Sequence, residues 1–481
     1  MIDVSCVHDL AQAGTHRGAI NALNLASARP DPFSTYEFYD HCLRNAAAYP
    51  DGSRLRLWLL LAFRGDELVG YLALKEGRHR VLGLPAIRLD LLTSYVGDRP
   101  HLVARPEESQ QVSVAMWAYL LGRKRDWSLL DFEQQDDTSA LLPVPPEAAA
   151  GPCQLRQWPN MATGIITLPS NGLTGYFGAL SHKSRSNVGR KMRALLDAGD
   201  VQLLTSSTAQ AAAVLFELYR CIEPHSWKGH ADLAIGRNAQ AIDLCAGMLD
   251  PAQPMRLVVQ VLLLDGVPIA GLISGMFGKG QYAIHMVYDE RQGDLAPGSA
   301  IMLLGVRHAL DCGCEFLNML WGSDHYKTRW LAQMHDTYSL QVYSVGGLYY
   351  WRRVLGDLRR RWVGEPAADA PVQFNPIRRA LRKLGKSHTA APTATATMPT
   401  VPRRDSTAAA LVEQARHLQV QCLTRMQLAA AMPFATSPAR TARPLAERQA
   451  RAAATTPSTL PTSSGSATSA PKTGGITLGA A

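Results

Sequence analysis

Apolar and polar positions follow the same order in two stretches of the chain that lie about 200 residues apart. In the first stretch the pattern predicts helices at 36–49 and 108–122 and strands at 55–63, 68–75, 87–95 and 127–133. In the second stretch it predicts helices at 173–198, 209–221 and 299–312 and strands at 255–264, 268–277, 282–288 and 315–320. Each stretch contains a hairpin that turns at a Gly–Asp or Asp–Gly pair, and the apolar runs that form the two hairpins match. We interpret the repetition as an internal duplication of one α/β unit.

Alternating strands and helices of this kind indicate an α/β (α+β) fold, in which mixed sheets are flanked by helices. We expect one half at residues 1–160, a second at 161–350, and a basic helical extension at 351–386. From 387 to 481 the chain is rich in Ala, Thr, Ser and Pro, which predicts a disordered tail. An Ala- and Leu-rich island at 406–432 has helical spacing. It is either a docking helix or an isolated helix of low stability, and the cost of nucleation favours the second.

The net charge of the 481-residue chain is +9, which by itself suggests binding to nucleic acid or to an acidic surface. The charge is unevenly distributed, however. Residues 351–481 hold 19 Lys and Arg against 6 Asp and Glu, whereas the first 350 residues hold 30 against 34. A nucleic-acid-binding fold needs a basic face on its folded part. We therefore expect no specific nucleic acid partner for the body of the protein.

Other classes of protein are disfavoured by missing patterns. The eight cysteines are scattered, the closest pair (Cys312 and Cys314) lacks the spacing of a redox or zinc motif, and no HExxH occurs. The most apolar runs, 57–63 and 257–264, are shorter than the roughly 20 residues that span a membrane. The first residues do not resemble a signal peptide. We expect a cytoplasmic protein with reduced thiols, no metal and no transmembrane segment.

The stretch with the clearest chemical potential is the loop between the strand predicted at 282–288 and the helix that follows it. A strand, a glycine-containing loop and a helix N-terminus place unpaired backbone N–H groups around a partial positive charge, which suits a pyrophosphate. An ordinary strand-to-helix turn has the same pattern, and the loop is neither GxGxxG nor a P-loop. The candidate ligand-binding residues of this loop are Arg291, Gly293, Pro297, Gly298 and Ser299.

Further marks surround this loop: Ser226-Trp227-Lys228-Gly229, Asp265-Gly266, Tyr288-Asp289-Glu290, Gly322, Tyr326-Lys327, Trp330, and a basic helix that opens at 180–187. Together they resemble the Gcn5-related N-acetyltransferase (GNAT) superfamily, in its branch of cellulose-biosynthesis (CelD/BcsL-like) acetyltransferases. The resemblance is best over residues 165–345 and thinner over 30–145. It implies a tandem GNAT-like architecture whose first half lacks the loop motif.

The resemblance also implies a mechanism, in which an acceptor attacks the thioester of acetyl-CoA or another acyl-CoA directly. It implies a general base at Asp289 or Glu290 and a general acid at Tyr326. Lys327 would neutralise a phosphate or an acidic substrate, and Trp227 and Lys228 would line the acceptor cleft. For each of these residues an ordinary structural role remains open, as a solvated carboxylate, a packed aromatic ring or a surface lysine. A covalent acyl-enzyme is disfavoured, because no Ser-His-Asp or Cys-His motif is recognisable.

The sequence departs from the family at Asn318, where relatives often have Asp before the Tyr-Lys pair. If that Asp is structural, little changes; if it is catalytic, this protein is slow or altered. The resemblance favours an N- or O-acyltransferase of cell-envelope, exopolysaccharide or cellulose biosynthesis, with a small-molecule, sugar or lipid-linked acceptor. The alternatives are a FemABX-like aminoacyl-tRNA-dependent transferase and a degenerate scaffold of a polysaccharide synthase complex. In the scaffold hypothesis, the C-terminal tail contacts a protein partner.

Overall fold

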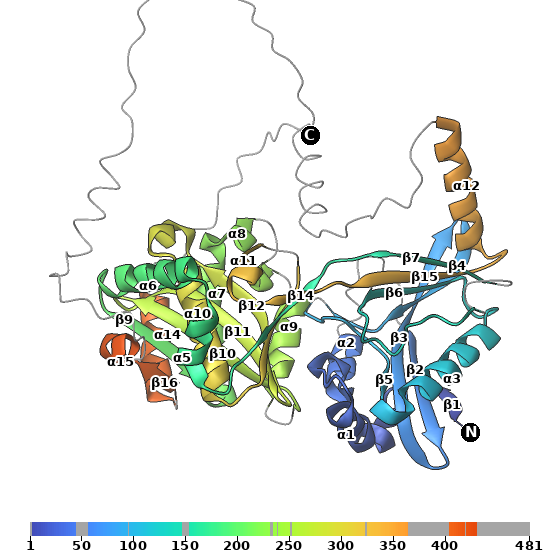
Figure 1. Ribbon diagram of the computed structural model, residues 1–481, viewed down its shortest axis with the longest axis horizontal. Coiled ribbons are helices and arrows are strands. Elements are labelled where there is room, and N and C mark those ends of the chain that lie inside the picture. Colours follow the sequence, from blue (N-terminus) through green and yellow to red (C-terminus); the bar gives the residue numbers. More distant parts are fainter. Residues whose placement is uncertain are drawn as a thin grey trace, which may run out of the picture. The chain divides into compact units, whose positions relative to one another are not determined.

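The computed structural model describes residues 2–44, 56–94, 96–146, 153–230, 234–237, 239–250, 253–322, 325–363, 404–418 and 420–430. All of them belong to one compact unit, residues Met1–Ala439. Within the described residues the strands form two mixed sheets, and helices flank these sheets (Figure 1). The α/β class expected from the sequence is confirmed.

The first sheet has the strand order β1-β2-β3-β4-β6-β15-β7, and β5 pairs with β3. Its strands are β1 (Asp3–Val7), β2 (Arg56–Arg64), β3 (Glu67–Val81), β4 (Leu84–Leu91), β5 (Val103–Ala104), β6 (Leu129–Gln135), β7 (Cys153–Pro159) and β15 (Tyr338–Ser344). The second sheet has the order β14-β8-β13-β12-β11-β10-β9-β16. Its strands are β8 (Thr163–Thr167), β9 (Val201–Ser206), β10 (Arg256–Leu264), β11 (Val267–Phe277), β12 (Gly280–Tyr288), β13 (Phe316–Trp321), β14 (Gln333–His335) and β16 (Val420–Leu423).

The α-helices lie between and around these strands. They are α1 (Arg17–Ala26), α2 (Tyr36–Arg44), α3 (Ser109–Gly122), α5 (Gly172–Ala179), α6 (His182–Leu196), α7 (Ala209–Ile222), α8 (Trp227–His230), α9 (Ala239–Met248), α10 (Pro297–Asp311), α11 (His325–Arg329), α12 (Leu348–Val363), α14 (Arg404–His417) and α15 (Arg425–Ala430). The single helix expected at 173–198 is two helices, because Ser181 caps α6 by accepting a hydrogen bond from the Ser184 backbone N–H. No helix within the described ranges is long and apolar enough to cross a bilayer.

The two predicted hairpins have the same register. In the β2–β3 hairpin Arg64 pairs with Glu67, Phe63 with Leu68 and Ala62 with Gly70. In the β10–β11 hairpin the corresponding pairs are 264 with 267, 263 with 268 and 262 with 270, so even the bulge recurs at an offset of 200 residues. In each half a further antiparallel strand, a helix and a parallel strand follow the hairpin. This agreement supports the interpretation as an internal duplication.

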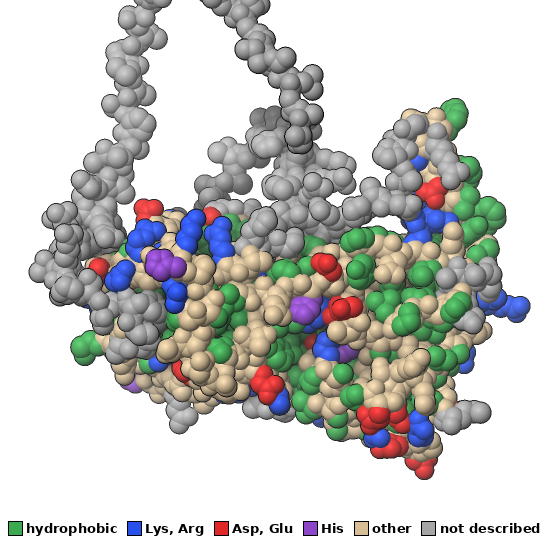
Figure 2. Space-filling model, in the orientation of Figure 1, with side chains coloured by type: hydrophobic (Ala, Val, Ile, Leu, Met, Phe, Trp, Pro, Cys, Tyr) green, Lys and Arg blue, Asp and Glu red, His purple; other side chains and the backbone are tan. Residues whose placement is uncertain are grey.

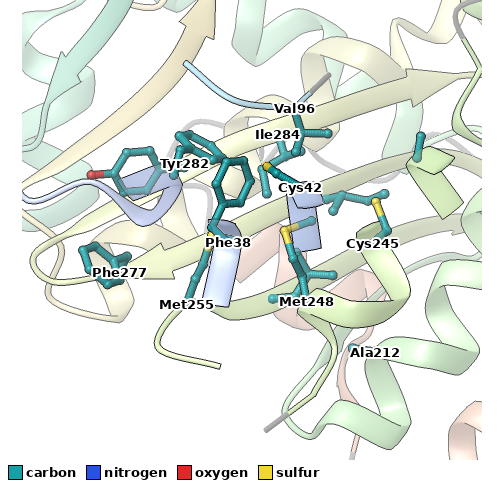
Figure 3. Packing of buried hydrophobic residues seen from close by; sticks show 14 of the residues in the cluster. Phe38, Cys42, Val96, Ala212, Cys245, Met248, Met255, Phe277, Tyr282 and Ile284 are labelled. Atoms are coloured by element: carbon teal, nitrogen blue, oxygen red, sulfur yellow. The ribbon is translucent and has the colours of Figure 1, made fainter. Parts of the chain in front are cut away.

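The two halves share a sheet and a core rather than forming separate bodies. Strand β15, at the end of the segment expected to form the second half, lies between β6 and β7 of the first sheet. The largest core cluster also draws on both halves. Figure 3 shows Phe38 and Cys42 of α2 close to Cys245 and Met248 of α9, and near Tyr282 of β12. The boundary expected at residue 160 therefore separates segments that share a sheet and a core.

Part of the expected tail packs on the second sheet. Strand β16 pairs with β9 at the sheet edge, and α14 contacts α7. Val412 and Ala415 of α14 are buried in the largest core cluster, while Leu428 of α15 is buried on the other face of the sheet. The idea of an isolated helix at 406–432 is thus wrong within the described residues, and the docking alternative is correct. The remainder of the predicted tail lies outside the described residues.

Candidate active site

The candidate site lies where two parallel strands of the second sheet diverge. β12 and β13 pair only at their first three residues, from Gly280 opposite Phe316 to Tyr282 opposite Asn318. Beyond these pairs the two strands form opposite walls of a cavity of about 680 Å³. The lining residues of β12 are Ala283, Ile284, His285, Met286 and Tyr288, and those of β13 are Met319, Leu320 and Trp321. Divergence therefore opens a cleft inside a sheet that is otherwise continuous.

Local irregularities shape both walls. The ladder between β11 and β12 passes from Ile273–His285 to Ser274–Ala283, which leaves Ile284 as a bulge residue. On the opposite wall Leu320 has a φ of 56°, which an L-residue rarely adopts. Bulges re-aim side chains next to active sites, so His285 is placed in the cavity wall by the backbone of its own strand.

The loop predicted from the sequence forms one end of this cavity. It consists of a 3-10 turn, Glu290–Leu295, followed directly by α10 with Pro297 in its first turn. A Cβ on Gly298 would lie 2.7 Å from the Tyr288 ring, so only glycine permits this packing. A Cβ on Gly293 would meet no atom within 4 Å. Glycine is thus required at 298 for close packing, whereas Gly293 borders open space.

Positive charge collects beside the start of α10. The Nζ of Lys191, on α6, donates to Ser299 Oγ over 3.4 Å. Ser299 is in the first turn of α10, so the ammonium group lies beside the start of this helix. Figure 2 shows Lys and Arg side chains gathered over α6. The described cavity lining includes Lys191, Lys228, Lys327 and Arg329 and contains no Asp or Glu. Together with the partial positive charge of a helix N-terminus, this lining favours an anionic ligand.

The structure brings together most, but not all, of the residues predicted for the site. Gly293, Gly298, Ser299, Trp227, Lys228, Tyr326 and Lys327 line the cavity. Asp289, Glu290, Arg291 and Pro297 are not among the described residues that line it. The loop is therefore in the predicted place, but its carboxylates do not face the cavity.

Asp289 is used to hold the loop. Its carboxylate accepts hydrogen bonds from the backbone N–H of Arg291 and from the guanidinium of the same residue. Burial opposes ionisation of this carboxyl, but the bonds from Arg291 outweigh burial and lower its pKa. An ionised carboxylate that lies outside the cavity and already accepts these hydrogen bonds is poorly suited to take a proton from a substrate. The Arg291 guanidinium is occupied by its ion pair with Asp289. Glu290 is exposed.

Lys327 is buried beneath the opposite wall. Its Nζ donates to the carbonyl oxygens of Leu320 over 2.7 Å and of Trp321 over 2.9 Å, at the end of β13. This lysine therefore fixes the irregular strand end, and its ammonium group points at the backbone. Tyr326 and Trp227 are instead partly exposed at the cavity, 37% and 39% respectively, where a ligand can reach them.

The sequence pattern missed a buried polar cluster beside the cavity. His285 lines the cavity, and its Nδ1 is hydrogen-bonded to the hydroxyl of Tyr219 on α7. Glu223 Oε1 lies 3.9 Å from the same nitrogen, and the Glu223 carboxylate accepts backbone N–H groups of Ile235 and Gly236, each over 2.7 Å. The only signal in the sequence was a histidine inside an apolar strand, which usually indicates a core position.

Asn318 belongs to a different network, away from the cavity lining. Its Nδ2 donates to Asp98 Oδ2 of the first half over 3.2 Å, and its Oδ1 accepts the backbone N–H of Leu320 over 2.8 Å. Arg99 in turn pairs with Asp98 and with Asp136. Asn318 is buried, and its hydrogen bonds join the two halves.

Residues 182–328 match the family model of the acetyltransferase (GNAT) domain. This region is a GNAT acetyltransferase domain. The match runs from α6, which carries Lys191, to α11, which carries Tyr326. The GNAT-type acyltransferase domain expected from the resemblance is thus confirmed for this region. The CelD/BcsL branch stays a prediction.

Several solved structures are similar to this chain at low sequence identity. FemX is 8% identical, covering 70% of this chain and 96% of FemX, with a TM-score of 0.47. A tandem GNAT protein from the clavulanic acid biosynthesis pathway is 13% identical, covering 71% and 98%, with a TM-score of 0.39. A C-terminal domain from Agrobacterium fabrum, described as part of a lysylphosphatidylglycerol synthetase, is 12% identical, covering 71% and 96%, with a TM-score of 0.41. No curated protein is detectably similar to the chain.

Proposed function

We propose that the protein transfers an acyl group from acyl-CoA to a nitrogen or oxygen of an acceptor that binds in the β12–β13 cavity. One observation carries the proposal: the start of α10, the Lys191–Ser299 contact and a lining without carboxylates all lie in the same cavity. That combination suits the diphosphate of a coenzyme. When bound, acyl-CoA supplies a thioester-activated acyl group.

The residues present fit such a ligand. Gly293 borders open space, and Gly298, at the second position of α10, has a backbone N–H with no acceptor within a regular helix. Lys191 is held beside the same helix start by its contact with Ser299. Lys191 and the backbone N–H of Gly298 bind the diphosphate and orient the coenzyme along the cleft between the strands. The Tyr288 ring packs on Gly298 and so supports the start of α10.

Two side chains of the cavity are suited to proton movement. Of the described lining residues, His285 is the one whose ordinary pKa lies near neutrality. It accepts the proton that leaves the acceptor as the new bond to the acyl carbon forms. Tyr326, partly exposed at the cavity, donates a proton to the sulfur released when the thioester bond breaks. Tyr219 and Glu223 orient His285 from the side away from the substrate.

The acceptor is proposed to be a sugar or an amino sugar of cell-envelope polysaccharide synthesis, acted on in the cytoplasm. The support is Trp227, whose partly exposed indole offers a flat apolar face for a sugar ring. Lys228 lies beside it, with Nζ 5.8 Å from the centre of the ring. The CelD/BcsL-like marks in the sequence point to the same class of acceptor.

Binding and chemistry are tested separately. Acetyl-CoA is expected to raise the melting temperature of the protein, because a ligand that binds the native state stabilises it. Gly293→Ala should keep this shift and Gly298→Val should lose it, because only the second substitution meets the Tyr288 ring. The absence of a shift with acetyl-, malonyl- and longer acyl-CoA would refute the proposal. Salt-sensitive binding of aminoacyl-tRNA in their place would favour the tRNA-dependent alternative.

The role of His285 is tested by His285→Gln, which keeps a polar side chain but removes the titrating group. The variant should retain the acetyl-CoA shift and lose about 100-fold or more in turnover. The limb of the pH–rate profile that reports the base should disappear with it. An unchanged profile would show that another group accepts the proton.

A further inference from the structure

Helix α12 carries an exposed apolar stripe that the acyltransferase site does not use. The stripe consists of Trp351, Leu355, Leu358 and Trp362, whose exposed fractions range from 49% to 92%. Spacings of four, three and four residues place these side chains on one face of the helix. In Figure 1 α12 extends beyond the end of the first sheet, and Figure 2 shows hydrophobic side chains along it. Four large apolar side chains on one free helix face call for a ligand or a surface.

The opposite face anchors the helix. Asp357 pairs with Arg353 over 3.6 Å and with Arg360 over 2.6 Å. The Arg353 guanidinium also lies 5.3 Å from the ring of Tyr343, on β15, and bonds to Gln154, on β7. At about 100° per residue, these three side chains lie on the other side of the helix from the stripe. The sheet therefore holds α12 by its polar face and leaves the stripe directed outward.

Arginines border the stripe. Arg352 and Arg359 are exposed, and each lies about a quarter turn from the centre of the stripe. Asp357 is the one acidic residue of the helix, and its carboxylate is engaged by arginines on the anchored face. Among the described residues no carboxylate pairs with Arg352 or Arg359. An apolar face with tryptophan near each end, bordered by such arginines, is typical of a helix that lies in a membrane interface.

We propose that α12 docks the protein on the surface of a bilayer that contains anionic lipid. The stripe inserts between the lipid headgroups, and Arg352 and Arg359 contact their phosphates. Charge complementarity favours an anionic bilayer as the partner, because anionic lipid attracts a basic helix whose apolar face is exposed. A second copy of the chain fits less well, since a coiled coil needs three to four heptads and this helix has 16 residues. The proposal does not depend on the acyl acceptor.

Vesicle co-sedimentation of the full chain tests this. The protein should pellet with phosphatidylcholine vesicles that contain phosphatidylglycerol, less with phosphatidylcholine alone, and less at high salt. Leu355→Ser with Leu358→Ser should abolish pelleting. The control Leu25→Ser, at an equally exposed leucine on α1 (51%), should not. Arg352→Gln with Arg359→Gln should weaken binding about five-fold per arginine at low salt, whereas lysine at both positions should preserve it.

Three results would overturn the proposal. One is a full chain that stays in solution with the anionic vesicles. Another is unchanged pelleting of the double serine variant, which would place the contact in another basic part of the chain. The third is concentration-dependent self-association that the serine substitutions abolish, since it would assign the stripe to a second copy. Leu355 and Leu358 are exposed, so the double serine variant should keep the melting temperature of the wild type. If its melting temperature falls, the vesicle binding of the Arg352→Gln, Arg359→Gln variant tests the proposal instead.

Discussion

Replacing Asn318 by aspartate, the residue that the family resemblance leads us to expect at this position, tests how the two halves are joined. In the wild type the Asn318 amide donates to Asp98 Oδ2 over 3.2 Å in a buried site. An ionised carboxylate in its place would face a second carboxylate at about the same distance. At an effective dielectric constant of about 20 that repulsion is about 5 kcal/mol. Asn318→Asp should therefore destabilise the fold at neutral pH.

Protonation limits this penalty and gives it a pH dependence. A carboxyl with an ordinary pKa of about 4 costs about 4 kcal/mol to protonate at pH 7, and a protonated carboxyl can donate to Asp98 as the amide does. Because Arg99 neutralises part of the charge on Asp98, we expect a loss of about 3 kcal/mol at pH 7. The folded state raises the pKa of the new carboxyl, so the loss is absent below about pH 4. Above that it grows by about 1.4 kcal/mol per pH unit until the raised pKa is passed.

Urea unfolding of the wild type, Asn318→Asp and Asn318→Ala between pH 4 and pH 8 measures the difference. The alanine variant loses the side-chain hydrogen bonds of Asn318 without adding a charge, so its penalty should not vary with pH. A penalty for Asn318→Asp that is equally large at pH 4.5 and pH 8 would refute the electrostatic reasoning. Acyl transfer that becomes faster in this variant would show that the family aspartate is catalytic, and that the structural role assigned to Asn318 is incomplete.

Two other substitutions and a truncation test further parts of the structure. Lys327→Met should lower the free energy of unfolding by about 2–4 kcal/mol, because it leaves the Leu320 and Trp321 carbonyls without their buried donor. Turnover should fall as well. Lys327→Arg is the control that keeps a charge. A chain that ends at residue 403 should be less stable to unfolding, by several kcal/mol, than one that ends at residue 430. The shorter chain lacks the buried side chains of Val412 and Leu428 and exposes the edge of β9. Equal melting temperatures of the two chains would contradict the observed docking. Tyr326→Phe should lower turnover and leave the acetyl-CoA thermal shift intact, and an unchanged turnover would remove this tyrosine from the proposed mechanism.

The parts of the fold that follow from nearby residues were predictable. The hairpins at 55–75 and 255–277, and the strand-to-helix loop before α10, depend on apolar runs, turn residues and a helix start that stand together in the sequence. Contacts between distant segments were not. The insertion of β15 between β6 and β7 depends on pairing across about 200 residues, which no local pattern encodes.

The same division applies to the site. Gly298 was predictable because a glycine at a helix start is a local signal, and its contact with the Tyr288 ring supports that choice. Asp289 was predicted as a general base because it follows a strand. Its carboxylate instead accepts hydrogen bonds from the backbone and side chain of Arg291, two residues later. His285 was overlooked because its partners lie more than 60 residues earlier, Tyr219 on α7 and Glu223 in the 3-10 turn that follows α7.

The position of β15 between β6 and β7 of the first sheet has a consequence for biosynthesis. While the chain emerges from the ribosome, β6 and β7 have no strand to bridge them until about 180 residues more have been made. During that interval two sheet edges stay open, and open edges invite pairing between nascent chains. Expression of residues 1–160 alone should therefore yield aggregates, and slower translation of the second half should lengthen the period during which a chaperone is needed.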